Sequence, residues 1–294
     1  MSIVVSYGPE GRGRGGLELA RLLSDSSGQP VLICCVIPDR WQGIGGMVEI
    51  DRDYQDYLQS LAHAALDRAR EALGPVTAGV DVQVVTARSA PAGLVEVAER
   101  SKAWMLVTGS SADGSWGHVA LGSVTDRLLH SCPVPVAIAP RGYRCHSGQT
   151  MRRITVAVDG SESTGAVLRS AAEMARGANA RLRVVTFAVR TRTMYPPELG
   201  LHIEERVIAA WRQQAAAVVD AAIAELPADH RGEIEQVVAE ATTWRNAIEE
   251  PGWAEGDVLV LGSSTSQSLV SRVFLGSTAT RILRYSPVPV IVVP

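Results

Sequence analysis

Two loops rich in glycine and serine contain the residues of this sequence whose types and spacing best suit ligand chemistry. One loop runs from Gly109 to Ser123 and the other from Gly262 to Ser277, and both end on Gly-Ser at the start of a predicted helix. Glycines let backbone N–H groups approach a phosphate closely, hydroxyls donate hydrogen bonds, and a helix N-terminus adds free donors and a positive dipole end. The loops therefore indicate phosphate binding. The alternative is that both serines are only N-caps and that the glycines only form turns.

Other patterns with catalytic or metal-binding potential are weak. The four cysteines, Cys34, Cys35, Cys132 and Cys145, form no C-x-x-C pair and have no histidine at ligand spacing, which argues against a zinc site or a disulfide framework. No G-x-x-x-x-G-K-[ST] segment is present, and no histidine can be paired with a nucleophile or an orienting carboxylate. We therefore predict no metal site, no catalytic residue and no conventional enzyme. A slow ATPase or nucleotidyl enzyme ranks last among the alternatives.

A glycine-rich segment near the N-terminus offers a further ligand hypothesis. Residues 11 to 16 satisfy G-x-G-x-x-G between a predicted strand and a predicted helix, and Asp39 follows the next strand, as in a dinucleotide fingerprint. The preceding strand ends near Tyr7, several residues too early, and the second half of the chain has nothing similar. We favour an exposed loop here, with Arg12 and Arg14 placed to approach a phosphate.

Alternating strands and helices must position these loops. Strict alternation of β-branched runs with segments of helical period predicts a parallel sheet covered by helices on both faces. Ligands bind such sheets where the strand order reverses, which here means the loops after the first and fourth strands. In the second half, the predicted strands are residues 153 to 158, 181 to 188, 233 to 240, 257 to 261 and 288 to 293, and the predicted helices are 162 to 177, 199 to 226, 243 to 254 and 276 to 285.

The sequence is an internal duplication with a period of roughly 150 residues. Residues 122 to 140 align with residues 276 to 294 without a gap, and share the Gly-Ser start, the Pro-Val-Pro-Val motif and the final proline. The polar stretch from 142 to 150 lacks apolar periodicity and suits an exposed linker. We therefore predict two domains, residues 1 to 141 and residues 151 to 294, joined by this linker.

The final strand of each half, Val134 to Ala139 and Val288 to Val293, follows a Pro-Val-Pro segment. Proline in a strand indicates an edge, and an apolar edge strand promotes aggregation unless another element covers it. The simplest cover is the equivalent strand of the other half. We predict an intramolecular pseudo-dimer in which the two sheets or their final strands meet, and leave open whether the chain also forms a homodimer.

As a set, these motifs resemble the universal stress protein family. The glycine loops resemble its nucleotide signature of Gly, two residues, Gly, nine residues and then Gly-Ser or Gly-Thr, while residues 158 to 161 and the Pro-Val-Pro-Val strand are similar to the start and end of its domain. The resemblance covers nearly the whole chain, twice. It implies, in each half, a doubly wound α/β domain with a five-stranded parallel sheet in the order 3-2-1-4-5. It also implies dimeric organisation and, in some members, bound ATP or another adenine nucleotide, with or without Mg²⁺.

The resemblance further implies which residues would bind the nucleotide. Asp159 would lie beside the adenosine at the end of the first strand of the second half, and Phe187 would offer backbone groups to the adenine from the second strand. The phosphates would be held by residues of the glycine loop and the following helix start, namely Gly262, Ser264, Gly276, Ser277 and Thr278. The corresponding residues of the first half are Val36, Gly109, Gly122, Ser123 and Val124.

Neither half keeps the family pattern intact. The first half has Ala112 at the middle glycine of the signature and Gly8 where the second half has Asp159. The second half has Thr265 at the middle glycine and one extra loop residue before Gly276. If the middle position needs a positive φ, a non-glycine residue costs on the order of 1 to 2 kcal/mol, enough to weaken binding about tenfold. We expect the better site in the second half, because it retains the carboxylate.

The composition narrows the classes of function. Apolar residues make up 46% of the chain and the net charge is −3, so the basic excess typical of a nucleic-acid binder is absent. The N-terminus shows no leader pattern, and we expect a cytoplasmic protein that contacts neither membrane nor nucleic acid. The leading hypothesis is a stress-response regulatory protein that binds an adenine nucleotide and acts on an unknown protein partner. The alternative is a nucleotide-free interaction scaffold with degenerate sites.

Overall fold

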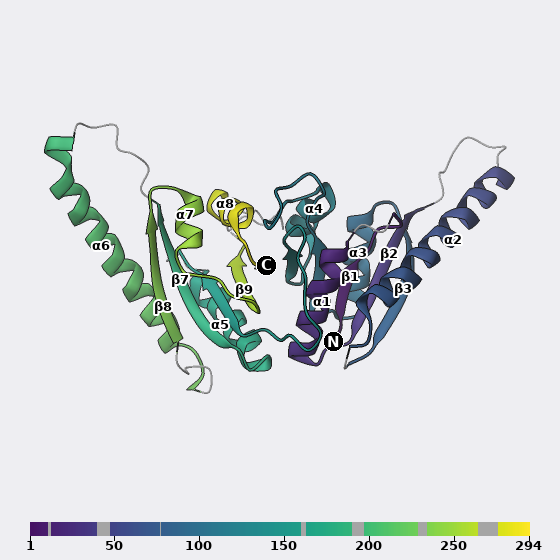
Figure 1. Cartoon of the computed structure of the whole chain (residues 1–294), viewed down its shortest axis with the longest axis horizontal. Helices are drawn as coiled ribbons and strands as arrows, with labels where there is room; N and C mark the ends of the chain where they lie inside the picture. Colours follow the sequence, from purple (N-terminus) through teal and green to yellow (C-terminus); the bar gives the residue numbers. More distant parts are fainter. Residues whose placement is uncertain are drawn as a thin grey trace.

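The computed structural model consists of two similar α/β halves that share one continuous sheet (Figure 1). It describes residues 1–10, 13–39, 48–76, 78–159, 163–189, 197–228, 234–263 and 276–294. The elements of the first half are β1 (Ile3–Ser6), α1 (Arg14–Ser27), β2 (Val31–Pro38), α2 (Val48–Leu73), β3 (Val80–Ala87), α3 (Ala90–Arg100), β4 (Met105–Gly109), α4 (Ser123–Ser131) and β5 (Val136–Ala139). Those of the second half are β6 (Arg153–Ala157), α5 (Thr164–Gly177), β7 (Arg181–Val189), α6 (Pro197–Ala224), β8 (Ile234–Ala241), α7 (Trp244–Glu249), β9 (Asp257–Gly262), α8 (Ser277–Tyr285) and β10 (Val290–Val293).

The predicted doubly wound fold is confirmed, because each half has its strands in the order 3-2-1-4-5. The complete sheet runs β3-β2-β1-β4-β5-β10-β9-β6-β7-β8, with parallel neighbours inside each half. At its centre β5 and β10 pair antiparallel, and Val290 lies opposite Ile138 while Val292 lies opposite Val136. The final strand of each half is therefore covered by its counterpart, which leaves no exposed apolar edge in the middle of the molecule.

Local sequence explains most element types and boundaries. The strand β2 is an almost continuous apolar run because parallel strands are buried on both faces. Helix α1 ends where Gly28 adopts a φ of 68° and donates its N–H to the Ser24 carbonyl at 2.8 Å. Helix α7 ends at Glu249 and not at residue 254 as predicted, because Pro251 cannot donate to the helix ladder and Gly252 takes a φ of 65°.

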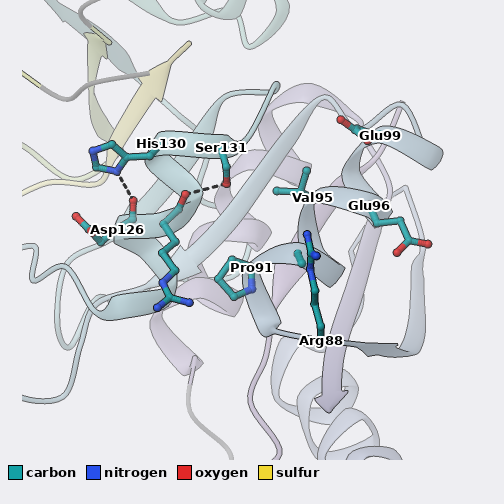
Figure 2. A pocket seen from close by; sticks show the side chains of 10 residues that line it. Arg88, Pro91, Val95, Glu96, Glu99, Asp126, His130 and Ser131 are labelled. Carbon is teal, nitrogen blue, oxygen red and sulfur yellow. Dashed lines mark hydrogen bonds between the residues drawn. The ribbon is translucent and has the colours of Figure 1, made fainter. Parts of the chain in front are cut away.

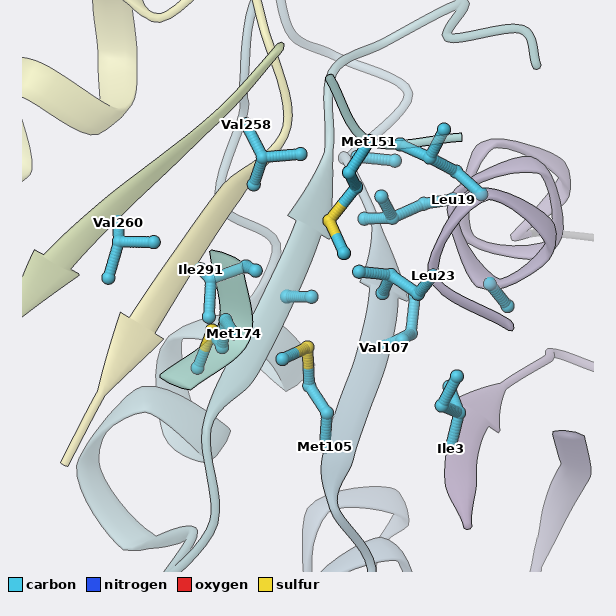
Figure 3. Close-up of a cluster of buried hydrophobic side chains, with 14 of the residues drawn as sticks. Ile3, Leu19, Leu23, Met105, Val107, Met151, Met174, Val258, Val260 and Ile291 are labelled. Carbon is cyan, nitrogen blue, oxygen red and sulfur yellow. The ribbon is translucent and has the colours of Figure 1, made fainter. Parts of the chain in front are cut away.

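Two apolar layers pack on opposite faces of the sheet. One layer involves α1, α2, α5 and α6, and the other involves α3, α4, α7 and α8. The first layer crosses from one half to the other: Leu23 of α1 and Met105 of β4 share it with Met174 of α5 and Ile291 of β10 (Figure 3). Each face of the sheet thus has a continuous core, and the carboxyl ends of the strands in both halves are held on one rigid frame.

The segment after β5 is less exposed than its polar composition predicts. Cys145 and Met151 are both buried in the first apolar layer. The Cys145 N–H donates to a carboxylate oxygen of Glu18 at 3.3 Å, and the Met151 N–H donates to the Ser26 hydroxyl at 2.7 Å. Two apolar anchors, which a periodicity criterion does not detect in so short a stretch, therefore attach this segment along α1.

Candidate functional site

The strand order reverses at β1 and β4 in the first half, and the chain is tightly packed there. Helix α1 begins after Gly13, whose φ of 124° strongly favours glycine. A Cβ on Gly13 would stand 3.0 Å from the Ser6 carbonyl oxygen, and a Cβ on Gly16 would stand 3.2 Å from the Gly109 nitrogen. The two glycines therefore let the first turn of α1 rest against the carboxyl ends of β1 and β4. This packing explains the described part of the G-x-G-x-x-G segment; Gly11 and Arg12 lie outside the described residues.

The helices that follow the fourth strand of each half differ from those that follow the third. Helices α3 and α7 have side-chain caps, because Ser89 accepts from the Ala92 N–H at 3.4 Å and Thr243 accepts from the Asn246 N–H at 3.3 Å. Helices α4 and α8 begin instead on glycine N-caps, which have no side chain to serve as acceptor. The first-turn N–H groups of α4 and α8 thus lack a side-chain cap, which suits an anion.

The predicted phosphate residues occupy these two helix starts. Gly122 and Gly276 are the N-caps themselves, so the alternative that Ser123 and Ser277 cap the helices is wrong. Both serines are the first residues of their helices and are exposed, as is Thr278, while Val124 is half-buried. Gly109 and Gly262 end strands β4 and β9. Ser264, Thr265 and the extra loop residue lie outside the described part of the chain.

The predicted adenine residues, Val36 and Phe187, lie on β2 and β7 just beyond the ends of the neighbouring strands. The β1–β2 pairing stops at Cys34 and the β6–β7 pairing stops at Val185, although both longer strands continue. Backbone groups along a strand alternate in direction, and the Cys34 carbonyl faces β1, where it accepts from the Tyr7 N–H at 2.9 Å. Two residues later, the backbone N–H and C=O of Val36 therefore point past the end of β1.

The second half repeats this geometry. The Val158 N–H donates to the Val185 carbonyl at 2.9 Å, as the Tyr7 N–H does to the Cys34 carbonyl, so the backbone of Phe187 points past the end of β6. The same pair of hydrogen bonds makes Gly8 and Asp159 equivalent positions. Asp159 is exposed and directly follows β6 and Val158. A carboxylate, backbone groups beyond the β6–β7 pairing and a helix start without a side-chain cap thus all lie toward the carboxyl ends of the strands of the second half.

The glycine loop of the first half is fastened to the segment after β5, a feature that no sequence motif indicated. The Arg141 guanidinium donates to the Gly114 carbonyl, and the backbone of Arg141 bonds to Gly117 and His118, each at 2.9 Å. The Trp116 ring lies 5.8 Å from the Arg141 Cζ and covers Gly142 so closely that a Cβ there would stand 2.4 Å from the ring. We call Trp116, Arg141 and Gly142 the loop clamp.

Inside the same loop, hydroxyl and backbone groups bond to one another. The Ser110 hydroxyl donates to the Ala139 carbonyl at 2.7 Å and accepts from the Ala120 N–H at 3.0 Å, while the Ser111 N–H donates to the Ala120 carbonyl at 2.9 Å. Ala112 does not have a positive φ, and the loop places that conformation at Gly117 instead. The departure from glycine at position 112 therefore produces no backbone strain.

The described residues contain no group of three or more His, Cys, Asp or Glu side chains that could hold a metal ion. In the same part of the chain, no helix is long and apolar enough to cross a membrane.

Arg14, at the start of α1, lies 3.9 Å from Glu18 and is largely exposed. Of the two arginines expected to approach a phosphate, Arg14 is the one within the described residues. It lies in the first turn of α1, which packs against the carboxyl ends of β1 and β4.

Comparisons with known proteins agree with this architecture. A model described as the universal stress protein family matches residues 2–140 and 150–294. A universal stress protein of Mycobacterium tuberculosis is 36% identical over 300 residues, with all of both chains covered. Two solved structures share the fold: a universal stress protein from Archaeoglobus fulgidus (TM-score 0.57, 17% identity, 99% of this chain and 97% of that chain) and a putative one from Pseudomonas aeruginosa (TM-score 0.58, 16% identity, 99% and 92%).

Proposed function

Since this chain belongs to the universal stress protein family, we propose that it is a stress-response regulatory protein that binds ATP or another adenine nucleotide. The nucleotide would bind where β1 and β4 part in the first half and where β6 and β9 part in the second. The observation that carries the proposal is the glycine N-cap of α4 and α8, which leaves first-turn donors without a side-chain cap at this edge. Bound nucleotide would bias a conformation or a partner surface.

The strand geometry supports an adenine base rather than a bare phosphate. The backbone N–H and C=O of Val36 and Phe187 lie beyond the last pairing with β1 and β6, and would form a donor and acceptor pair in each half. Such a pair matches the hydrogen-bonding edge of adenine, which also carries one donor beside one acceptor. With the base beside the second strand of each half and the phosphates beside the loop after the fourth strand, the nucleotide would lie across the point where the strand order reverses.

The proposal assigns the tighter site to the second half. Asp159 supplies an exposed carboxylate beside β6, whereas the equivalent residue of the first half is Gly8. In the first half, the loop clamp and the bonds of Ser110 already engage several polar groups of the glycine loop. Mg²⁺ would enter with the phosphates and neutralise part of their charge, because the described residues supply too few carboxylates to hold it alone.

Isothermal titration calorimetry of the full chain with ATP tests the proposal, with and without Mg²⁺. Saturable heat with ATP and a clear preference for ATP over GTP are expected, since guanine presents two acceptors, N7 and O6, where adenine presents the N7 acceptor and the N6 donor. No heat and no thermal shift at millimolar ATP would dismiss nucleotide binding.

The loop clamp favours a second candidate function, a nucleotide-free interaction scaffold. A glycine loop whose groups bond within the protein presents a fixed surface rather than an open phosphate cradle. Under this hypothesis, the yield of a partner in a pull-down is independent of added nucleotide. A yield that changes with ATP would favour the nucleotide-dependent regulator instead.

We also infer how the two halves are organised in the cell. Residues 1–141 and 151–294 would be the two repeated domains, joined by 142–150, and the β5–β10 pairing within one continuous sheet supports their behaviour as an intramolecular pseudo-dimer. The four cysteines are free and buried, which fits a reducing cytoplasm. Limited proteolysis that cuts first between residues 141 and 151, and leaves two fragments associated through the shared sheet, would support these boundaries.

A further inference from the structure

The segment after β5, residues 140–151, contacts both elements that would hold phosphate in the first half, and we call it the strap. At the glycine loop, the Arg141 N–H donates to the His118 carbonyl and the Arg141 carbonyl accepts from the Gly117 N–H, each at 2.9 Å. At the first turn of α1, a Cβ on Gly15 would stand 3.5 Å from the first carbonyl oxygen of the strap. The strap therefore joins the glycine loop to α1.

Further along the chain, hydrogen bonds hold the strap against α1. The Cys145 N–H donates to a carboxylate oxygen of Glu18 at 3.3 Å, and the Cys145 carbonyl accepts from the Arg21 guanidinium at 3.5 Å. Near the end of α1, the Met151 N–H donates to the Ser26 hydroxyl at 2.7 Å. Cys145 and Met151 are both buried. Because α1 is part of the packed core, these contacts fix the strap and hold its first residues against the glycine loop.

The strap occupies backbone groups of the glycine loop that a phosphate would otherwise use. Backbone N–H groups in glycine-rich loops are common donors to phosphate. The Gly117 N–H, at a φ of 79°, donates to the strap instead, and the Gly114 carbonyl accepts from the Arg141 guanidinium. The Trp116 ring covers Gly142. A phosphate that approached this part of the loop would have to displace the loop clamp.

Two glycines of the strap separate the contact with the loop from backbone conformation. Gly142 has a φ of 78°, and a Cβ there would stand 2.4 Å from the Trp116 ring. Gly148 has a φ of 75°, but no atom lies within 4 Å of the position of its Cβ. A side chain at either position therefore meets similar backbone strain, and only the side chain at Gly142 also disturbs the loop clamp.

A pocket between α3 and α4 is also large enough for a nucleotide and is a rival site. Its volume is about 720 Å³, within the range of about 300 to 1,000 Å³ for small-molecule sites. Figure 2 shows the carboxylates of Glu96, Glu99 and Asp126 around it, whereas its arginines are Arg88 and Arg127. Three carboxylates against two arginines disfavour a polyphosphate. The pocket also lies on the face of the sheet opposite α1 and the strap.

We propose that the strap is an autoinhibitory latch on the nucleotide site of the first half, which rests on the proposed function. While the loop clamp is closed, the Gly117 N–H and the Gly114 carbonyl are engaged, and phosphates bind only after Arg141 moves off the loop. The apparent affinity of such a site falls with the fraction of molecules that are open. The first half would therefore bind ATP weakly because of the strap, and not only because it lacks a counterpart of Asp159.

Native mass spectrometry of the full chain over a range of ATP concentrations tests the latch, because it counts the nucleotides on each molecule. Wild type is expected to bind one ATP in the second half and a second ATP only weakly. Arg141→Ala removes a charge-assisted hydrogen bond from the loop clamp, so the second ATP should bind at least about tenfold more tightly. Arg144→Ala, which removes an exposed arginine from the strap, is the matched control and should bind ATP as wild type does.

Gly142→Ala repeats the test with the charge of the strap unchanged. The added methyl group should push the Trp116 ring away from the strap and should again strengthen binding of the second ATP. Gly148→Ala carries a similar cost of positive φ without a clash, and should bind ATP as wild type does.

Two further variants locate the second ATP. Gly122→Val, combined with Arg141→Ala, places a bulky side chain at the start of α4 and should abolish the gain in affinity. Arg127→Ala, in the α3/α4 pocket, should preserve the gain when it is combined with Arg141→Ala. Loss of the gain in the Arg127 variant alone would place the second ATP in the pocket and refute the latch.

The remaining outcomes separate the latch from the proposed function. A second ATP that binds equally to wild type, Arg141→Ala and Gly142→Ala would overturn the latch, while the first ATP would still support the proposed function. Weaker binding by Arg141→Ala would show that its guanidinium is a phosphate ligand, which also contradicts the latch. The absence of ATP from every variant would dismiss the proposed function and the latch together.

Discussion

Gly16 of α1 lies against Gly109 at the end of β4, so that a Cβ on Gly16 would stand 3.2 Å from the Gly109 nitrogen and 3.3 Å from the Thr108 carbonyl carbon. The neighbouring atoms belong to the backbone of a central strand and cannot rotate away. We expect Gly16→Val to lower the free energy of unfolding by about 1 to 3 kcal/mol, the usual cost of overpacking. Urea denaturation measures this. Gly177→Val, at a helix position where no atom lies within 4 Å, is the control and should have little effect.

Removal of the carboxylate beside β6 should weaken nucleotide binding. We expect Asp159→Ala to raise the dissociation constant for ATP about tenfold, equivalent to about 1.4 kcal/mol. Calorimetry on the purified chain gives this value. The converse variant, Gly8→Asp, places a carboxylate at the equivalent position of the first half, where Gly8 has no positive φ, and should strengthen binding there. Unchanged affinity in both variants would contradict the assignment of these two positions.

The loop clamp should control the mobility of the first glycine loop. Arg141→Ala removes the hydrogen bond to the Gly114 carbonyl and the stacking on Trp116. Loss of one charge-assisted hydrogen bond corresponds to about 1.5 to 3 kcal/mol, so amides of residues 111–118 should exchange at least about tenfold faster. Hydrogen exchange with mass spectrometry reads this directly. Arg144→Ala, an exposed neighbour, should leave exchange in the loop as it is in wild type.

A buried arginine connects β7 to the loop after α7. The side chain of Arg183 is fully buried, donates to the Thr155 hydroxyl at 3.0 Å and to the Pro251 carbonyl at 2.7 Å, and stacks 5.0 Å from the Trp253 ring. Burial lowers the pKa of this guanidinium.

We expect Arg183→Ala to lower the free energy of unfolding by about 3 to 5 kcal/mol, because a cavity and unpaired acceptors remain. Thermal or urea unfolding measures the loss. Arg176→Ala, exposed on α5, should change stability by no more than about 0.5 kcal/mol. A small effect at Arg183 would mean that the loop rearranges to satisfy its own carbonyls.

The thiols should be inert in the folded protein. Burial raises the pKa of Cys34 to about 12 and that of Cys35 and Cys145 to about 11, and also raises the pKa of Cys132. The reactive species is the thiolate, which is scarce near neutral pH when the pKa is raised. A chromogenic disulfide reagent should therefore label none of the four quickly in buffer and all four in urea. Rapid labelling of the native chain would show that one of these layers opens.

The local sequence determined the architecture of each half. Alternation of β-branched runs with helical segments, and the repeated Gly-Ser and Pro-Val-Pro-Val motifs, predicted two doubly wound units, because a buried parallel strand and an amphipathic helix each leave a short-range pattern. The same motifs indicated the helix starts at Gly122 and Gly276. The sequence indicated a phosphate site at these helix starts because the glycine, the hydroxyl group and the helix terminus are neighbours in the chain.

Only the tertiary structure decided the contacts between distant residues. The repeated Pro-Val-Pro-Val motif indicated that the two final strands meet, but not the antiparallel register that sets Val290 opposite Ile138. The clamp of Arg141 on the glycine loop and the burial of Arg183 join segments with no shared local pattern. Such features depend on the distances that the folded core fixes between elements, and a sequence read one segment at a time contains no measure of those distances.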